Sequence, residues 1–380
     1  MSPSVTVRSE PVAPTRRRRR IFYLDLVRAL ATALIVLTHF NNPFLTDGRY
    51  LLTNQPFGIY VGAVGVSLFL IVSGASLAVT YKGDFSLRTF YWKRFKGIYP
   101  MFWTAWVLGT LYFFVDMDGN PLNAAPARSI IWTVLGIDGL VANFGVRTAY
   151  LLGEWFLGFI ILFYVVFPVL LRLIERFPKA TAVGLLALYA ASLWLLRDGQ
   201  AAFPPSVVLT VRLPELAFGI YVIRYVRRVP ALVAVPAAGV LVVTGLLPTQ
   251  IPEDVATTLV GIACFLILVV LAPWVEIGPV REAVALVSKY SYPVFLVHHV
   301  IIYKLFFYSG LDYGSYAPIQ LVTLFGVVCV LTLALAVALD RLTSRVVALT
   351  ARAFEGQWWR PAGRVNELDQ TTERRRDAAR

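Results

Sequence analysis

The chain is a succession of long apolar blocks separated by short polar segments. Many blocks reach the roughly 20 residues that an α-helix needs to cross a bilayer. Their polarity does not alternate, which favours spanning helices over the strands of a β-barrel. A further block, residues 129–137, is too short to span and is expected to lie at the outer surface or to re-enter. The long blocks predict ten membrane-spanning helices, at residues 21–40, 58–80, 98–115, 149–171, 180–197, 206–223, 230–248, 254–273, 290–308 and 317–340.

Composition supports this fold class. Hydrophobic residues make up 58% of the 380 residues and charged residues only 15%. A soluble domain has about a quarter of its residues charged. We therefore expect an all-α, polytopic integral membrane protein of the cell membrane.

The net charge of +13 is distributed as a membrane topology requires. With the N-terminus placed in the cytoplasm, 28 of the 35 lysines and arginines fall on the cytoplasmic side and four on the outer side. Cytoplasmic loops carry such an excess of basic residues. The charge therefore predicts that both termini are cytoplasmic, and it gives no support to nucleic acid as a partner.

The chain divides into three segments. Residues 1–20 are polar, end in five arginines and are expected to form a disordered cytoplasmic tail. A signal peptide is the alternative, although charged residues interrupt the apolar run that follows and no small-residue cleavage site is evident. Residues 21–340 form the membrane domain, and residues 341–380 a polar cytoplasmic tail.

The two cysteines lie within apolar blocks and are expected to be buried free thiols, with a disulfide as the alternative.

The first apolar block carries three ionisable residues, Asp25, Arg28 and His39. Arg28 and His39 are 11 positions apart, which on a helix places them about 20° apart in direction and about 16 Å apart along the axis. Asp25 precedes Arg28 by three residues and could pair with it near the membrane surface. Ionisable groups inside a membrane are costly and usually face a bundle interior or a wet cavity.

Histidine is rare in this chain, and all three copies lie in or beside predicted spans: His39, His298 and His299. Each could have a structural or a functional role. Imidazole is well suited to proton transfer near neutral pH. No spacing of Cys and His typical of a metal site is present, so no metal is expected.

Six stretches of the chain together are similar to the membrane acyltransferase family 3. The Arg28-to-His39 spacing resembles the Arg-x10-His pattern of that family's first helix. The match covers residues 21–340 and is carried by LDLVRALATALIVLTHF, GAVGVSLFLIVSGASL, FYWKRFKGIYP, WFLGFIILFYVVFP, RLPELAFGI and SYPVFLVHH.

Two positions depart from the family's pattern. Several members carry a pair of glutamates where this chain has Ile160 and Ile161, which counts against the lipopolysaccharide O-acetylase subgroup. Gly97 stands where an arginine is often found in the basic segment before Tyr99-Pro100. Lys93 and Lys96 could substitute as point charges, without bidentate geometry.

The resemblance implies transfer of an acyl group, often acetyl, from coenzyme A to a carbohydrate or related acceptor. The phosphates of the donor could bind the basic segment, expected to be a cytoplasmic loop before a helix that begins at Tyr99-Pro100. Ordinary topological charge is the alternative role for these residues. The residues that could contact the donor are Arg88, Lys93, Arg94, Lys96 and Ser73.

For the chemistry, His39 is the candidate general base, and Arg28 could stabilise negative charge on the donor or at the reaction centre. His298 is a further candidate, while His299 points about 100° away from it and is the weaker one. A covalent acyl-enzyme remains open, and Ser73-Gly74 could instead serve close helix packing. The candidates for the acceptor site are Glu154, Trp155, Arg212 and Glu215, of which the last two could also neutralise each other.

Two other function classes remain. A proton-coupled transporter or flippase would use the same buried charges as a substrate path. A membrane scaffold would use none of them. We expect an acetyl-CoA-dependent acyltransferase acting on a carbohydrate or glycolipid.

Overall fold

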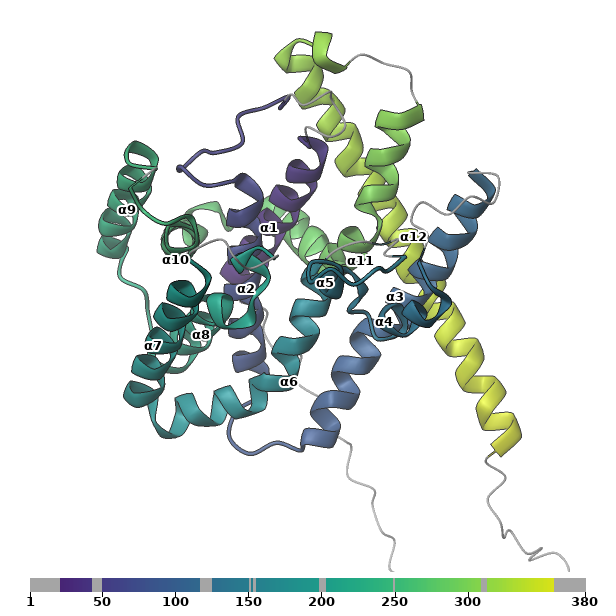
Figure 1. Ribbon diagram of the computed structural model, residues 1–380, viewed down its shortest axis with the longest axis horizontal. Coiled ribbons are helices and arrows are strands. Elements are labelled where there is room, and N and C mark those ends of the chain that lie inside the picture. Colours follow the sequence, from purple (N-terminus) through teal and green to yellow (C-terminus); the bar gives the residue numbers. More distant parts are fainter. Residues whose placement is uncertain are drawn as a thin grey trace, which may run out of the picture.

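The structure is a computed structural model that describes residues 21–42, 50–116, 125–149, 152, 155–197, 203–248, 250–308 and 313–358. Throughout these ranges the regular structure is helical and no strand occurs. The α-helices are α1 (Phe22–Phe40), α2 (Val61–Thr80), α3 (Leu87–Asp116), α4 (Ile130–Val134), α5 (Asp138–Ala142), α6 (Trp155–Arg176), α7 (Pro178–Leu196), α8 (Leu209–Tyr225), α9 (Ala234–Leu246), α10 (Glu253–Val275), α11 (Gly278–Tyr308) and α12 (Pro318–Trp358), as Figure 1 shows. Short 3-10 turns occur at Ala127–Ser129, Pro205–Val207, Ala231–Val233 and Tyr313–Ser315.

Every predicted span coincides with a helix. Seven helices in the described ranges are long and apolar enough to cross a membrane, namely α1, α2, α6, α7, α10, α11 and α12. The all-α class is therefore confirmed for the described residues, and these seven helices support a multi-pass membrane protein. Helices α3, α8 and α9 occupy the three other predicted positions, and the short block at 129–137 forms the broken pair α4 and α5. The N-terminal tail lies outside the described residues, and Cys264 and Cys329 are free.

Three predictions about helix ends are wrong. Helix α12 continues to Trp358, past the predicted end of its span at residue 340. Helix α3 begins at Leu87, so the basic segment lies in its first turns and Pro100 lies inside the helix rather than at its start. Helix α11 likewise begins at Gly278 and includes the basic residues placed in a loop before residue 290. Hydropathy marks only where apolar residues begin, whereas lysine and arginine are good helix formers and extend a helix into water.

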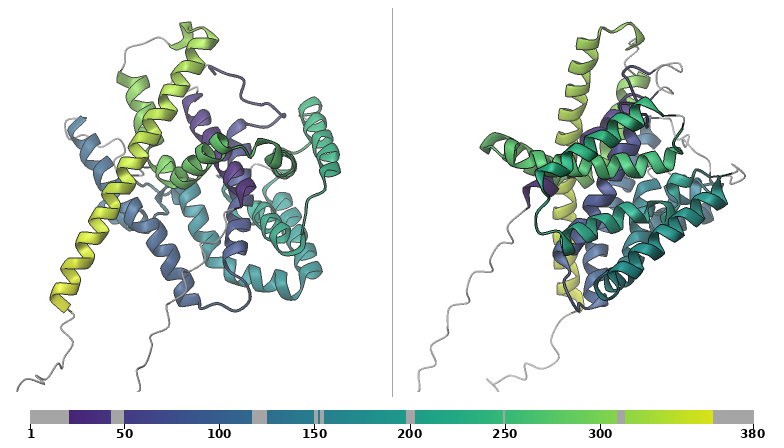
Figure 2. Two further views of the ribbon diagram at one scale, coloured as in Figure 1. Left: turned by 180° about the vertical axis from the view of Figure 1, so that it is seen from behind. Right: turned by 90° about the vertical axis from the view of Figure 1, so that its left-hand side faces the viewer.

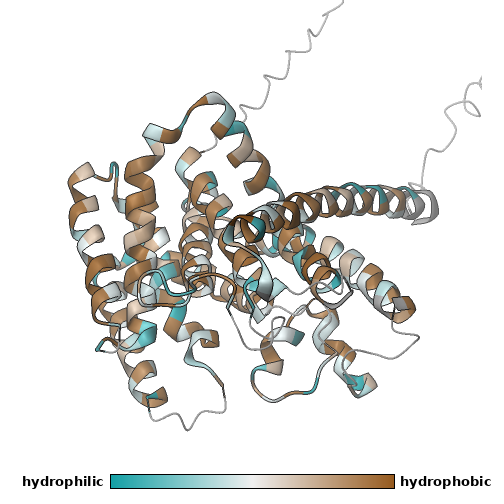
Figure 3. Cartoon of the chain, turned by 90° about the horizontal axis from the view of Figure 1, so that it is seen from above, coloured by the Kyte–Doolittle hydropathy of each residue, from teal (hydrophilic) through white to brown (hydrophobic). Residues whose placement is uncertain are grey.

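The outer helices turn large apolar side chains away from the protein. Leu186 of α7, Val235 of α9 and Val330 of α12 are 61%, 67% and 68% exposed. Figure 3 shows apolar residues along most helices, and Figure 2 shows α12 running along the outside of the bundle. In water such surfaces would drive association, so we interpret them as the faces that contact lipid.

Helices α1, α2, α8 and α11 form the centre, where α2 packs on α8 and α1 packs on both α2 and α11. Helices α2 and α8 approach so closely that a Cβ on Gly74 would overlap the carbonyl oxygen of Leu216. A Cβ on Gly219 would in turn overlap the carbonyl oxygen of Ile71. Such reciprocal small residues are typical of close helix pairs in membranes.

Candidate active site

Helix α1 carries Arg28 and His39 to two different cavities. His39 lines a cavity of about 560 Å³, here called the His39 cavity. Arg28 lines a second cavity of about 340 Å³, here called the Arg28 cavity. The two residues project from the same side of α1, about 16 Å apart along its axis. The segment therefore places a guanidinium and an imidazole at two depths of the membrane domain.

The three histidines of the chain lie together. The ring of His39 lies 4.9 Å from that of His298 and 4.3 Å from that of His299. The contact between α1 and α11 creates this cluster from residues 260 positions apart. His298 and His299 are adjacent on α11, and their rings stack with centres 4.3 Å apart.

Hydrogen bonds assign the nitrogen roles of His298. Its Nδ1 lies 2.8 Å from the carbonyl oxygen of Phe295 and 3.2 Å from that of Val294. Because a carbonyl only accepts, Nδ1 carries the hydrogen and Nε2 carries the lone pair of the neutral ring. That Nε2 atom is fully buried and has no hydrogen-bond partner among the described residues.

His299 makes the direct contact with His39. Its Nε2 lies 3.0 Å from Nδ1 of His39, so one of these nitrogens donates to the other. When His39 donates, its Nδ1 holds the hydrogen and its Nε2 holds the lone pair. His299 then orients the ring of His39 and stabilises the imidazolium that forms when His39 takes a proton.

The histidine cluster is also the group of described residues that could hold a metal ion, since one nitrogen of each ring lies within 4.8 Å of the others. A tetrahedral site needs lone pairs that converge on one point. The rings of His298 and His299 are stacked, only 28° from parallel, and Nε2 of His299 already contacts Nδ1 of His39. A hydrogen-bonded pair of His39 and His299 fits this geometry better, and the absence of a metal stays a prediction.

The polar part of the Arg28 cavity's lining consists of Arg28, hydroxyl groups and one further cation. Arg28 donates from a guanidinium nitrogen to Oγ of Ser76, at 2.7 Å. Lys289 lines the same cavity and donates to the hydroxyl of Tyr290, at 3.0 Å. Asp25, predicted as a partner of Arg28, accepts a hydrogen bond from Ser288 at 2.6 Å. The hydroxyl residues of the lining are Ser73, Ser76, Ser288, Ser291, Tyr164 and Tyr292.

Of the predicted basic cluster, Arg94 is half-buried and lies beside a residue of this cavity's lining. Its guanidinium lies 5.6 Å from the ring centre of Tyr164, which lines the cavity, and 5.9 Å from that of Tyr81. The other three members, Arg88, Lys93 and Lys96, are exposed. The amino group of Lys96 lies over the ring of Trp92, at 5.5 Å. The helix thus separates residues that are close in sequence onto different faces.

The His39 cavity brings together aromatic and acidic side chains. Trp155 and Arg212, both predicted for the acceptor site, line it, whereas Glu154 lies outside the described residues. Tyr50 and Tyr60 line it as well. The carboxylates of the lining come from Glu253 and Asp254, at the start of α10.

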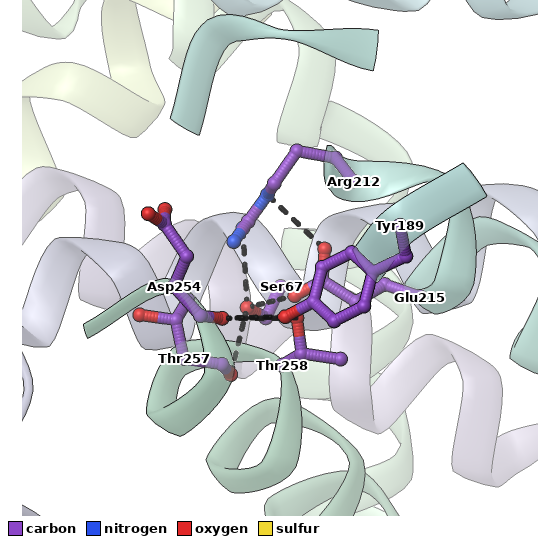
Figure 4. Close-up of polar contacts among 7 residues, drawn as sticks. All are labelled: Ser67, Tyr189, Arg212, Glu215, Asp254, Thr257 and Thr258. Carbon is purple, nitrogen blue, oxygen red and sulfur yellow. Dashed lines mark hydrogen bonds and ion pairs between the residues drawn. The ribbon is translucent and has the colours of Figure 1, made fainter. Parts of the chain in front are cut away.

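Arg212 and Glu215 form a buried ion pair behind this cavity. Nε of Arg212 lies 3.1 Å from Oε2 of Glu215, and the two side chains are 2% and 0% exposed. Ser67 accepts from Arg212 at 3.2 Å and donates to Glu215 at 2.6 Å, as Figure 4 shows. The pair neutralises itself, so Arg212 reaches the cavity with its charge already compensated.

Sequence reasoning missed several residues of these cavities. His299 was ranked below His298 because a helical wheel gives relative directions only within one helix. The charge distribution places Lys289 in a cytoplasmic loop, and Glu253 and Asp254 lie at the start of the predicted span 254–273, so no pattern in the sequence marks them as site residues. Their proximity to the cavities arises from the packing of α1, α2, α10 and α11, for which the sequence offers no local signal.

Comparison with known proteins identifies one family. A family model described as an acyltransferase domain, that of acyltransferase family 3, matches residues 21–341. No curated protein and no solved structure matches the chain.

Proposed function

The chain belongs to acyltransferase family 3, and on that premise we propose that this membrane acyltransferase moves an acyl group, such as acetyl, from acyl-CoA to a hydroxyl or amine of a carbohydrate, glycolipid or glycosylated metabolite. The observation that carries the proposal is the pair Arg28 and His39, directed from one side of α1 into two cavities. One cavity offers cations and hydroxyls, and the other offers an imidazole with aromatic and acidic side chains.

The proposed topology has ten spanning helices in the cell membrane, with both termini in the cytoplasm. The support is the distribution of lysine and arginine, which favours the cytoplasmic side for the N-terminal end of α1. Arg28 is closer to that end than His39. The Arg28 cavity then faces the compartment that contains coenzyme A.

The donor is proposed to bind in the Arg28 cavity. Arg94 and Lys289 supply positive charge for the phosphates of coenzyme A, because charge-assisted hydrogen bonds to phosphate are among the stronger polar contacts. The hydroxyls of Ser73, Ser76 and Ser291 suit the amides of the pantetheine arm. Arg28, about 16 Å from His39 along α1, binds the donor rather than the reacting carbon.

The transfer is proposed to occur beside His39. An acceptor hydroxyl gives its proton to Nε2 of His39 while its oxygen attacks the thioester carbon. The C–O bond forms, the C–S bond breaks, and the imidazolium returns the proton to the departing thiolate. His299 holds Nδ1 of His39 throughout, at the observed distance of 3.0 Å. No group other than the two substrates is consumed.

The acceptor is proposed to be a sugar because of the lining of the His39 cavity. Tyr60 and Trp155 offer flat apolar faces for a sugar ring, and the carboxylates of Glu253 and Asp254 accept hydrogen bonds from its hydroxyls. Binding sites of this size commonly combine an apolar lining with a few polar groups that set orientation.

The test uses the purified full-length protein in detergent, incubated with labelled acetyl-CoA and an extract of cell envelope. We expect the label to appear in a glycan or glycolipid fraction. A transporter needs no turnover of acetyl-CoA, so the absence of both labelled product and released coenzyme A would overturn the proposal. Label confined to protein or to water-soluble acetate would contradict the carbohydrate acceptor alone.

A further inference from the structure

Three phenylalanines separate the two cavities. Phe69, Phe156 and Phe295 line both the His39 cavity and the Arg28 cavity, and no other described residue does so. They come from three helices, α2, α6 and α11. The two cavities therefore adjoin at aromatic side chains, although polar groups line each of them.

The rings form a connected series. The centre of Phe156 lies 5.8 Å from that of Phe69 and 5.9 Å from that of Phe295, with interplanar angles of 51° and 61°. These are edge-on and tilted contacts of the kind that aromatic pairs prefer. Phe295 also lies 6.3 Å from the ring of His298. The partition thus lies directly beside the histidine cluster.

On the proposed function, the reacting end of the donor must pass these rings. The donor is held beside Arg28, whereas the base that activates the acceptor is His39, beyond the partition. The cysteamine and β-alanine units next to the sulfur of coenzyme A are unbranched. An opening that admits them also admits an unbranched acyl chain, since both have the cross-section of a single extended chain.

A branched acyl group presents a different cross-section. A methyl branch next to the carbonyl carbon widens the group at the point where it passes the rings, without making it longer. Packed aromatic side chains resist such insertion, because overpacking forces neighbours out of their preferred rotamers. A ring partition therefore discriminates by width rather than by length.

We propose that Phe69, Phe156 and Phe295 set the acyl specificity of the enzyme, acting as a sieve that passes unbranched acyl groups and rejects branched ones. This inference rests on the proposed function. The donors that test it are n-butyryl-CoA and isobutyryl-CoA, which have the same atoms and charge and differ only in branching.

The experiment compares kcat/KM for these two donors in the unaltered protein, in Phe156→Ala and in Phe163→Ala. Phe163 is the matched control, because it is a buried phenylalanine of the same helix and lines neither cavity. We expect the ratio of isobutyryl to n-butyryl transfer to rise at least tenfold in Phe156→Ala and to stay within twofold in Phe163→Ala. An unchanged ratio in Phe156→Ala, or an equal rise in the control, would overturn the sieve.

Two additions separate a failed sieve from a failed fold or a failed function. Phe69→Leu and Phe156→Leu retain most of the side-chain volume and are used if the alanine variant does not purify as a folded protein. The ratio of isobutyryl to n-butyryl transfer is expected to change in the same direction.

Proton leak through vesicles that contain the protein needs no catalysis. Joining the two cavities in Phe156→Ala should raise this leak severalfold over the unaltered protein and Phe163→Ala. A leak that does not rise contradicts the partition, even if no acyl-CoA is consumed.

Discussion

Nδ1 of His39 lies 3.0 Å from Nε2 of His299, across the contact between the first and the eleventh α-helix. This pairing gives the proposed base a hydrogen-bond partner that orients its ring. It also gives a role to His299, which on sequence alone is a weaker candidate than His298. His298 instead binds the backbone of its own helix through Nδ1.

The first prediction concerns His299. His299→Leu should lower kcat by about 10- to 100-fold, because His39 loses the acceptor that orients it and stabilises its protonated form. The KM for acyl-CoA should change by less than twofold. His299→Asn retains an acceptor oxygen and should recover a large part of the loss. Equal activity of the leucine and asparagine variants would contradict a hydrogen-bonding role.

The second prediction concerns Arg28. Arg28→Ala should raise the KM for acyl-CoA at least tenfold and leave the KM for the acceptor within twofold, because on the proposed function Arg28 lines the cavity that binds the donor. Ser76→Ala removes the hydroxyl that accepts from Arg28 and should give a smaller effect in the same direction. Steady-state kinetics with both substrates varied checks this, and an equal rise in both KM values would place Arg28 elsewhere.

The basic residues of α3 should differ in their effects. Arg94→Ala should raise the KM for acyl-CoA severalfold, since its guanidinium lies over Tyr164 beside the Arg28 cavity. Lys93→Ala and Lys96→Ala should remain within twofold, because both side chains are exposed and a single exposed charge contributes little. If the lysine variants lose as much donor affinity as Arg94→Ala, the cluster acts as a whole.

The contact between α2 and α8 predicts a stability effect. Gly219→Ala should lower the melting temperature in detergent by several degrees, because its methyl group would overlap the carbonyl oxygen of Ile71 and overpacking costs about 1–3 kcal/mol. Gly184→Ala, on the lipid-facing helix α7, is the matched control. A Cβ there meets no atom within 4 Å, so this variant should melt no lower than the unaltered protein. Equal melting of both variants would contradict the close crossing.

The sequence predicts the positions of the helices because hydrophobic length is a property of each segment alone. It does not predict that α3 and α11 extend into the polar segments, since the basic residues there have high helix propensity and low hydropathy at once. The spacing of Arg212 and Glu215 indicates their ion pair, which forms within one helix. His299, Lys289 and the three shared phenylalanines depend on which faces of α1, α2, α6 and α11 meet, and this packing between helices has no local signature.

The most direct measurement is release of free coenzyme A from acetyl-CoA by the purified protein in detergent, in the presence of an envelope acceptor. The unaltered protein should release the thiol and label the acceptor in equal amounts. His39→Ala, folded to the same extent by size-exclusion chromatography, should reduce both by a factor of at least about 100. Undiminished thiol release and acceptor labelling in His39→Ala would contradict the central claim that this imidazole activates the acceptor.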